Sequence, residues 1–251
     1  MARAAVQGRL GDRIRWRIAE VADRRVESDS AVTLMLDVPD WPGHVAGQHV
    51  DVRLTAEDGY STQRSYSIAS APESRYLELT VQRLPGGEVS PYLVDELVPG
   101  DQLELRGPVG GWFVWEQQQT EPVMLIAGGS GVVPLMSMVR ARETAGSRVP
   151  FRLLYSVRTP SDLLYASELR QGAPGLDTTY LYTREAPSQT PRTPGRIDAD
   201  DLTRFGWPPD FEPACYVCGP TGFVEKVAAY LVLLGHSAER VRTERFGDSG
   251  G

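Results

Sequence analysis

Apolar and polar residues alternate with a short period through the first part of this chain. Up to about residue 115, apolar positions alternate with polar ones in short segments separated by glycine, proline and aspartate turns. Alternation of this kind is typical of antiparallel strands with one buried face. The segments are RIRWRIAEV (13–21), AVTLMLDVP (31–39), HVDVRLT (49–55), RSYSIAS (64–70), YLELTVQRL (76–84) and DQLELRG (101–107). With one short helical segment, SPYLVDEL (90–97), they predict an antiparallel β-barrel.

From about residue 122 the apolar residues instead form nearly continuous runs, most of them followed by helical periodicity. Buried parallel strands joined by crossover helices have this pattern. The runs are VMLIAGG (123–129), FRLLYSV (151–157), TTYLYT (178–183) and CYVCG (215–219). The predicted fold class is therefore a two-domain chain, an antiparallel β-barrel followed by an α/β parallel-sheet domain, with WEQQQTEP (115–122) as the linker.

Composition narrows the class of protein. The chain has 251 residues, of which 41% are hydrophobic and 24% are charged, as in ordinary globular proteins. No run approaches the about 20 apolar residues that a membrane helix needs, and MARAAVQGRL lacks the apolar core of a signal peptide. We expect a soluble, cytoplasmic protein without a membrane partner. The net charge of −7 argues against nonspecific binding of nucleic acid.

Basic residues gather near the start of the chain. Arg13, Arg15 and Arg17 would share one face of a strand. That face is either a docking patch for an acidic partner or a solvated strand face, and the sequence leaves both interpretations open.

The only two cysteines, Cys215 and Cys218, lie in a segment that is predicted to be a strand. Residues three apart on a strand point to opposite faces, so we expect neither a disulfide nor a shared metal ion. The three histidines are scattered and lack the spacing of a zinc site. Redox chemistry in this chain would therefore require an organic cofactor.

A glycine-rich turn, GGSGVVP (128–134), follows the first apolar run of the second domain. Glycines allow a tight strand-to-helix turn and let a pyrophosphate approach backbone N–H groups at the helix start. Pro134 suits the first helical turn, but it replaces the third glycine of the usual dinucleotide fingerprint, and the lysine of a P-loop is absent. The segment is either a nucleotide loop or a tight turn without a ligand.

Arginines and hydroxyls follow the next two strands. Ser156 and Arg158 end one strand, and Thr183 and Arg184 end the other. Together they could grip the 2′-phosphate of NADPH, whereas NAD sites commonly place an acidic residue on the ribose. These residues favour NADPH over NADH.

The strand RSYSIAS carries a cation, an aromatic ring and hydroxyls. Alternation places Arg64 and Tyr66 on one face and Ser67 on the other. The tyrosine could stack on a flat ring while the arginine neutralises a phosphate. Downstream, GGEVSPYL (86–93) starts a short helix, where Gly87 and Ser90 could form a second anion site. A core tyrosine beside a surface arginine remains an equal alternative.

In order along the chain, these motifs resemble those of the ferredoxin–NADP reductase superfamily, without an appended iron–sulfur domain. RSYSIAS resembles its R-x-Y-S/T flavin motif and GGEVSPYL its pyrophosphate segment. GGSGVVP is similar to its nicotinamide-nucleotide loop, CGP (218–220) to its hydride-site motif and ERFG (244–247) to its C-terminal motif. The resemblance implies a flavin-binding barrel at 1–116, with 1–13 as a candidate flexible extension, and a NAD(P)-binding domain at 117–251.

The resemblance also implies roles for single residues. Arg64 would hold the flavin pyrophosphate, Tyr66 would pack on the isoalloxazine ring, and Phe246 resembles the aromatic that shields the flavin, although residues follow it here. The expected catalytic residues are Ser67 near the flavin, Cys218 beside the nicotinamide ring and Glu244 for proton relay or positioning. The residues expected to bind cofactors are Arg64, Ser65, Tyr66, Ser67, Val81, Gln82, Arg83, Gly87, Val89, Ser90, Gly129, Ser130, Gly131, Pro134, Ser156, Arg158, Thr183, Arg184, Cys218, Gly219, Pro220 and Phe246.

The resemblance implies a flavin-dependent oxidoreductase. It would take a hydride from NADPH, with NADH as the second choice, onto FAD rather than FMN. It would pass electrons singly to a separate ferredoxin, flavodoxin or oxygenase component, because no four-cysteine ferredoxin segment follows the C-terminal motif. The alternatives are a free flavin or quinone reductase without a protein partner and a non-catalytic nucleotide-binding subunit.

Overall fold

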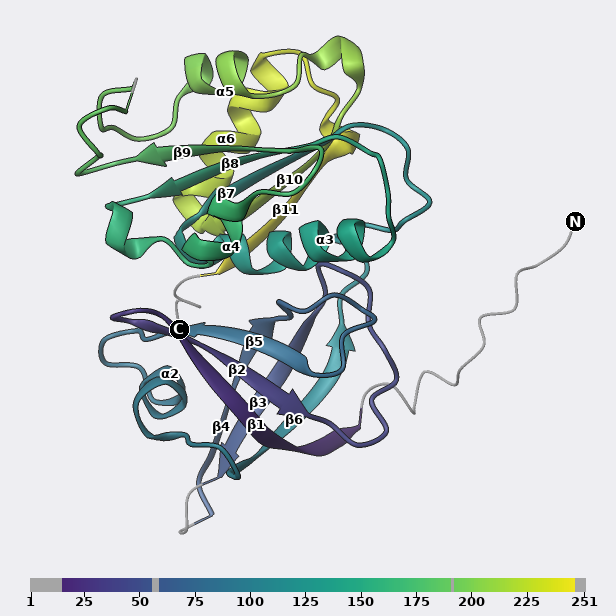
Figure 1. Cartoon of the computed structure of the whole chain (residues 1–251), viewed down its shortest axis with the longest axis vertical. Coiled ribbons are helices and arrows are strands. Elements are labelled where there is room, and N and C mark those ends of the chain that lie inside the picture. The colour runs from purple at the N-terminus through teal and green to yellow at the C-terminus, as the bar shows by residue number, and fades with distance from the viewer. Residues whose placement is uncertain (1–14, 56–58, 191, 247–251) are drawn as a thin grey trace, which may run out of the picture.

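The computed structural model describes residues 15–55, 59–190 and 192–246, arranged as two stacked domains (Figure 1). Six segments of the first domain form strands, as their alternation predicts, and they pair antiparallel in the order β4-β3-β6-β1-β2-β5. Their bounds are β1 (Trp16–Ser28), β2 (Ala31–Asp37), β3 (His49–Thr55), β4 (Ser61–Ser67), β5 (Leu77–Gln82) and β6 (Gln102–Val109).

The six-stranded sheet closes into a barrel. Ile68, directly after β4, forms a bridge with Leu79 of β5, which joins the two edges of the sheet. Inward-facing side chains such as Leu34 form the barrel core. The helical segment between β5 and β6, which comprises α2 (Val89–Pro91) and the π-helix η1 (Tyr92–Glu96), packs against the same core. The predicted barrel is confirmed, although β4 begins and ends three residues before the predicted segment.

The second domain is a five-stranded parallel sheet in the order β11-β10-β7-β8-β9. Helices α3 and α4 lie on the side of the sheet that faces the barrel, and α5 and α6 lie on the far side (Figure 1). Its strands are β7 (Val123–Gly128), β8 (Phe151–Val157), β9 (Leu176–Tyr182), β10 (Ala214–Pro220) and β11 (Val241–Phe246). Its helices are α3 (Val132–Thr144), α4 (Ala166–Gln171), α5 (Ala199–Phe205) and α6 (Thr221–Leu233), and its 3-10 turns are η2 (Gly129–Gly131), η3 (Pro160–Asp162), η4 (Pro209–Phe211) and η5 (Ala238–Arg240).

The predicted linker is partly built into the core. Trp115 is 2% exposed, forms a bridge with Ala46 and packs edge-on against Phe151 of the second domain. A large buried aromatic ring therefore anchors the start of this segment to both domains, so residue 115 does not belong to a plain linker. The domain boundary at 116/117 stays a prediction.

At Arg17, the structure agrees with neither a docking patch nor a solvated face on the basic N-terminal strand. This arginine is 8% exposed, and its Nη1 donates a hydrogen bond to the carbonyl oxygen of Gly107 at 3.3 Å. Burial removes Arg17 from a solvated face or docking patch, whereas Arg15 remains exposed. Arg13 and the candidate extension 1–13 lie outside the described residues. In the part of the chain that the structure describes, no helix is long and apolar enough to cross a membrane.

Candidate active site between the barrel and the parallel sheet

Strand β4 presents the residues of the predicted flavin motif. Arg64 and Ser65 are exposed, and the Ser65 hydroxyl donates a hydrogen bond to Oδ1 of Asp51 at 2.7 Å. The ring of Tyr66 is half-buried against the barrel core. Burial raises the pKa of Tyr66 to about 12 although the nearby charge of Arg64 opposes the rise, so the phenol stays neutral at physiological pH. The strand therefore offers a cation beside a half-buried aromatic ring.

The loop after β5 holds the predicted second anion site. The Ser90 hydroxyl accepts a hydrogen bond from the backbone N–H of Leu84 at 3.0 Å, and the Gly87 N–H donates to the Leu84 carbonyl at 3.0 Å. Arg83 pairs with Asp95 at 3.1 Å. Of the residues in this region that are predicted to contact the flavin, Gln82 and Arg83 are exposed. The side chains of Val81 and Val89 are buried in the barrel core, so only their backbone atoms could contact a ligand.

The glycine-rich turn of the second domain lies directly against the CGP segment. A Cβ atom on Gly131 would collide with the backbone carbonyl group of Cys218. Gly129 has a φ of +56°, and Pro134 occupies the first turn of α3, whereas Ser130 is half-buried. Only glycine allows this approach, so the residue type at 131 follows from packing between the two predicted nucleotide segments.

The predicted phosphate-binding residues meet at the ends of β8 and β9. The Arg184 N–H donates to the Arg158 carbonyl at 2.9 Å, and the Thr183 N–H donates to the Val157 carbonyl at 2.8 Å. Both arginines are exposed, whereas Ser156 is 6% exposed. The structure therefore brings the two arginines to the same end of neighbouring strands, whereas the Ser156 side chain is buried.

The three residues predicted to be catalytic lie together where the domains meet. The Ser67 hydroxyl of the barrel lies close enough to the Glu244 carboxylate of β11 to favour its charged form. Glu244 is the register partner of Cys218 on the neighbouring strand β10. Burial raises the pKa of Glu244 to about 7, although the nearby Ser67 hydroxyl opposes the rise. Burial, followed by the charge of Glu244, also raises the pKa of the Cys218 thiol well above its ordinary value.

Two family models match the two domains. The oxidoreductase FAD-binding domain matches residues 19–114, and the oxidoreductase NAD-binding domain matches residues 125–229. The chain belongs to the ferredoxin–NADP reductase superfamily.

Curated proteins and solved structures are similar to most of this chain. A flavohemoprotein of Chromobacterium violaceum is 32% identical over 94% of this chain and 62% of its own length. The glycine betaine monooxygenase reductase subunit of Pseudomonas aeruginosa is 33% identical over 80% of this chain and 56% of its own. The flavohem-like FAD/NAD-binding domain of the Vibrio cholerae nitric oxide dioxygenase superposes with a TM-score of 0.82 at 26% identity, covering 92% and 99%. The chain thus spans about three fifths of the curated relatives' length.

The described residues fit the two nucleotides that bind to members of this superfamily. Arg64 and Tyr66 supply a cation and a ring face on one strand, as a flavin nucleotide requires. Gly131 brings the backbone at the start of the 13-residue helix α3 against Cys218, and such helix starts bind pyrophosphate. Pro220 is exposed and is the register partner of Phe246, whose half-buried ring packs against the core. Gly247 and the tail that follows lie outside the described residues.

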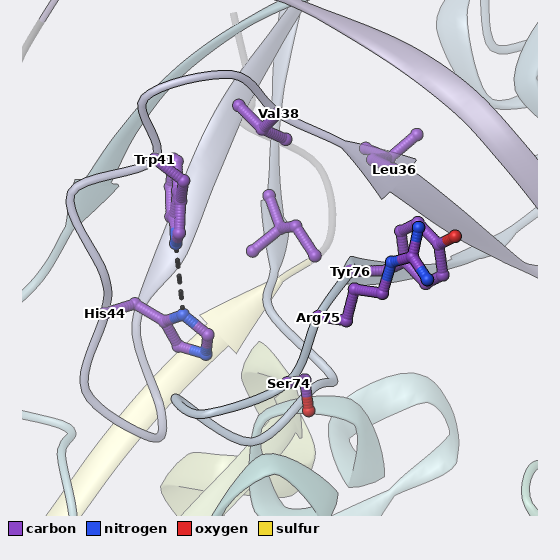
Figure 2. Close-up of a pocket in the computed structure, with 8 residues that line it drawn as sticks. Leu36, Val38, Trp41, His44, Ser74, Arg75 and Tyr76 are labelled. Atoms are coloured by element: carbon purple, nitrogen blue, oxygen red, sulfur yellow. Dashed lines mark hydrogen bonds between the residues drawn. The ribbon is translucent and has the colours of Figure 1, made fainter.

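A small pocket on the barrel contains none of these superfamily site residues (Figure 2). The Trp41 Nε1–H donates to His44 Nδ1 at 3.3 Å, so the neutral imidazole carries its proton on Nε2 and donates to the Ser70 carbonyl at 3.1 Å. Burial lowers the pKa of His44, although the Ser70 bond opposes this effect. His44 therefore anchors Ser70. The pocket is lined by Leu36, Val38, Trp41, His44, Ser74, Arg75, Tyr76 and Leu77.

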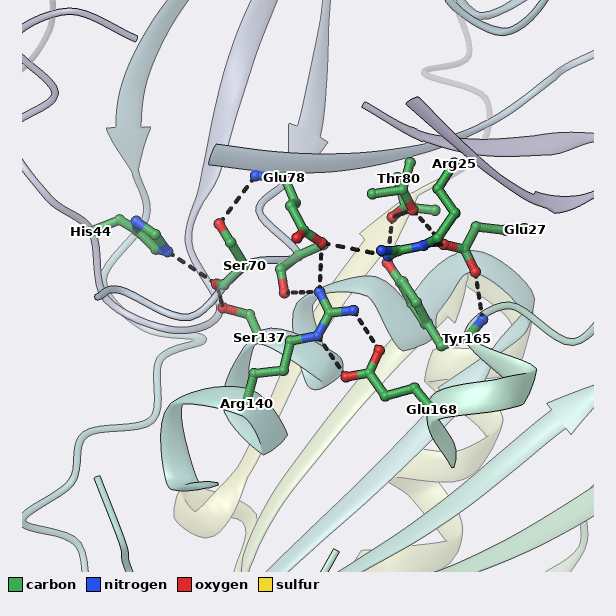
Figure 3. Close-up of polar contacts among 12 residues, drawn as sticks. Arg25, Glu27, His44, Ser70, Glu78, Thr80, Ser137, Arg140, Tyr165 and Glu168 are labelled. Atoms are coloured by element: carbon green, nitrogen blue, oxygen red, sulfur yellow. Dashed lines mark hydrogen bonds and ion pairs between the residues drawn. The ribbon is translucent and has the colours of Figure 1, made fainter. Parts of the chain in front are cut away.

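The sequence did not identify the residues that join the domains. Ser137 and Arg140 of α3 and Tyr165 before α4 all bond to the barrel (Figure 3). The sequence offers one signal for this contact. Ser137 and Arg140 are three residues apart, and therefore on one face, in a helix whose other residues are mostly apolar.

Proposed function

We propose that this chain is a flavin-dependent reductase that takes a hydride from NADPH and passes electrons singly to a separate redox protein. The observation that carries the proposal is the meeting of Ser67, Glu244 and Cys218 across the two domains. A hydroxyl, a carboxyl and a thiol converge where a ligand of the barrel would meet a ligand of the parallel sheet.

The binding residues would orient the two nucleotides. When bound, a flavin supplies the ability to take a hydride as an electron pair and to release electrons one at a time. Arg64 would neutralise the flavin pyrophosphate and Tyr66 would offer a ring face. The turn at Gly131 would receive the nicotinamide nucleotide beside Cys218, and orientation of this kind supplies a large part of the rate in such reactions.

The three convergent residues would control protons at this place. With a pKa of about 7, the Glu244 carboxyl is close to half-protonated at neutral pH, so it can hold or release a proton there. The nearby Ser67 hydroxyl favours the charged form of this carboxyl. The Cys218 thiol stays protonated because its pKa is raised, so we assign it a neutral contact with the nicotinamide ring rather than a role as a nucleophile.

Two finer choices follow from the binding residues. We propose NADPH rather than NADH, because Arg158 and Arg184 lie at adjacent strand ends where they could share a 2′-phosphate. We propose FAD rather than FMN, because the model that matches the barrel is that of an FAD-binding domain. Anaerobic titration with each nucleotide and mass measurement of the extracted flavin test the two choices.

We further propose that the electron acceptor is a small carrier or an oxygenase component. Relatives named as monooxygenase or dioxygenase reductase components support this choice. Purified protein should reduce cytochrome c quickly only when a carrier such as ferredoxin or flavodoxin is added. Equally fast reduction of free flavin or quinone without a carrier would contradict it and favour a partner-free reductase.

Single substitutions test the catalytic assignment. We expect Ser67→Ala and Cys218→Ala to slow stopped-flow flavin reduction by NADPH about tenfold or more, because orientation at the reacting atoms is lost. Flavin affinity should change much less. Cys215→Ala is the matched control, since Cys215 is equally buried on the opposite face of β10. Reduction at the wild-type rate in both Ser67→Ala and Cys218→Ala would reject the assignment.

A further inference from the structure

Arg140 of α3 makes four hydrogen bonds at the domain interface (Figure 3). Its Nη1 donates to the Ala69 carbonyl and to Oε2 of Glu78 in the barrel, both at 2.9 Å. Its Nε and Nη2 donate to the two carboxylate oxygens of Glu168 in its own domain, at 2.8 and 2.6 Å. A planar guanidinium bonded on both edges fixes an orientation as well as a distance.

The same helix makes a second contact with this segment of the barrel, at Ser70. The Ser137 hydroxyl donates to the Ser70 carbonyl at 2.7 Å, and His44 Nε2 donates to the same carbonyl from the barrel. The Ser70 hydroxyl in turn accepts from the Glu78 N–H at 3.1 Å. Two consecutive carbonyls, those of Ala69 and Ser70, are therefore held by α3.

These contacts lie on the elements that carry the proposed cofactor sites. Ala69 and Ser70 lie two and three residues after Ser67, and Glu78 lies on β5, the strand that also contains Val81. In the other domain, Arg140 lies about 12 Å along α3 from the helix start at Val132, at about 1.5 Å per residue. The contact therefore joins the segment that follows the flavin motif to the helix that starts at the nucleotide turn.

Tyr165 adds a further contact at the same interface. Its hydroxyl donates to the Thr80 hydroxyl of β5, and its backbone N–H donates to Glu27 at 3.0 Å. The Arg140 guanidinium lies 5.0 Å from the centre of the Tyr165 ring. Tyr165 adopts a φ of +56°, which costs a non-glycine residue free energy, and the surrounding bonds hold it there.

We propose that Arg140, assisted by Ser137, is a positioning residue for hydride transfer. It holds the segment after the flavin motif and the helix after the nucleotide turn at one spacing, so that the two bound rings lie in reacting geometry. This inference rests on the proposed function and adds a residue that touches neither nucleotide. Its effect should appear in the rate of the transfer step and not in the affinity for either nucleotide.

Arg140→Met removes the charged contact and keeps the aliphatic bulk. We expect flavin reduction at saturating NADPH to slow about 10- to 100-fold, since displacements of about 1 Å cost rates of this size. The dissociation constants of flavin and NADPH should stay within about twofold of wild type, because neither nucleotide contacts Arg140 in the proposal. Ser137→Ala, a milder change, should slow the same step less.

Arg142→Met is the matched control. Arg142 lies on the same helix and is 3% exposed, but it donates to Val149 within its own domain. It should lose stability without losing the rate of flavin reduction. Hydrogen–deuterium exchange gives a readout that needs no activity: the amides of residues 69 and 70 should exchange faster in Arg140→Met and at the wild-type rate in Arg142→Met.

The results of these experiments distinguish failure of the proposed function from failure of the positioning role of Arg140. A wild-type protein that binds no flavin, or whose flavin NADPH does not reduce, overturns the proposed function together with this inference. A wild-type protein that is reduced, with Arg140→Met reduced equally fast, overturns only the positioning role. Equal slowing in Arg140→Met and Arg142→Met would also overturn it, since general destabilisation would then explain both.

Discussion

Glu244→Gln should remove a pH-dependent cost of folding. Burial raises the pKa of Glu244 from 4.5 to about 7, and each tenfold change in the ionisation constant is worth about 1.4 kcal/mol, so the whole rise corresponds to about 3 kcal/mol. The folded chain binds the proton more tightly than the unfolded chain does. Glu244 therefore leaves the free energy of unfolding undiminished below about pH 4.5. Between pH 4.5 and about 7 the free energy of unfolding falls, and above about pH 7 the full loss of about 3 kcal/mol is reached.

A neutral glutamine has nearly the same shape as glutamate and avoids this loss of stability. Wild type and Glu244→Gln should thus have similar stability near pH 4, whereas at pH 8 the variant should be more stable by up to about 3 kcal/mol. For a chain of this size, that difference raises the melting temperature by roughly 6 to 12 °C.

Thermal unfolding of flavin-free protein from pH 4 to pH 8.5 measures this effect. Contributions from other groups cancel in the difference between wild type and variant. Glu239→Gln serves as the control, because Glu239 is exposed shortly before β11. A difference in melting temperature that is the same at every pH would refute the reasoning, since the pKa of Glu244 would then not be raised in the folded protein.

Three further outcomes test the packing around the site. In the native protein, Cys215 and Cys218 should react with a disulfide reagent far more slowly than after unfolding, because burial raises both thiol pKa values; rapid native labelling in an absorbance assay would contradict this. Gly131→Ala should weaken NADPH binding and lower the melting temperature. Gly222→Ala in α6, whose added Cβ has nothing within 4 Å, should leave the melting temperature unchanged or raise it slightly, because alanine favours a helix. Tyr165→Phe should cost about 1 kcal/mol in chemical denaturation, and no loss would show that its hydroxyl bond adds nothing.

Both domain architectures could be predicted because each follows directly from burial. The barrel strands have one buried face and therefore alternate, whereas β7 is buried along its whole length and reads as one apolar run. The motifs at the strand ends were also readable, because a parallel sheet gathers its loops at one edge. Cys215 and Cys218 lie in different cores, on opposite faces of β10, as the strand period predicts.

Other features could not be read from the pattern. Strand β11 has the sequence VRTERF, in which charged residues interrupt the apolar ones, so periodicity indicated no strand. It forms at the edge of the sheet because β10 supplies its hydrogen bonds. Trp115 followed a run of strands and preceded polar residues, so its burial between the domains depended on tertiary contacts alone. The roles of the individual site residues stay predictions.

Contacts at several places along the interface orient the two domains. β4 meets β11 at Ser67, and α3 meets the barrel through Arg140. β10 and β11 meet the segment before the linker at the Val114 carbonyl, which accepts hydrogen bonds from Tyr216 and Arg242 at 2.8 and 2.7 Å. Contacts at separate places along an interface restrict the rotation of one domain against the other. Because each bond is directional, loss of one contact should act mainly on orientation, and so on the rate of transfer more than on nucleotide affinity.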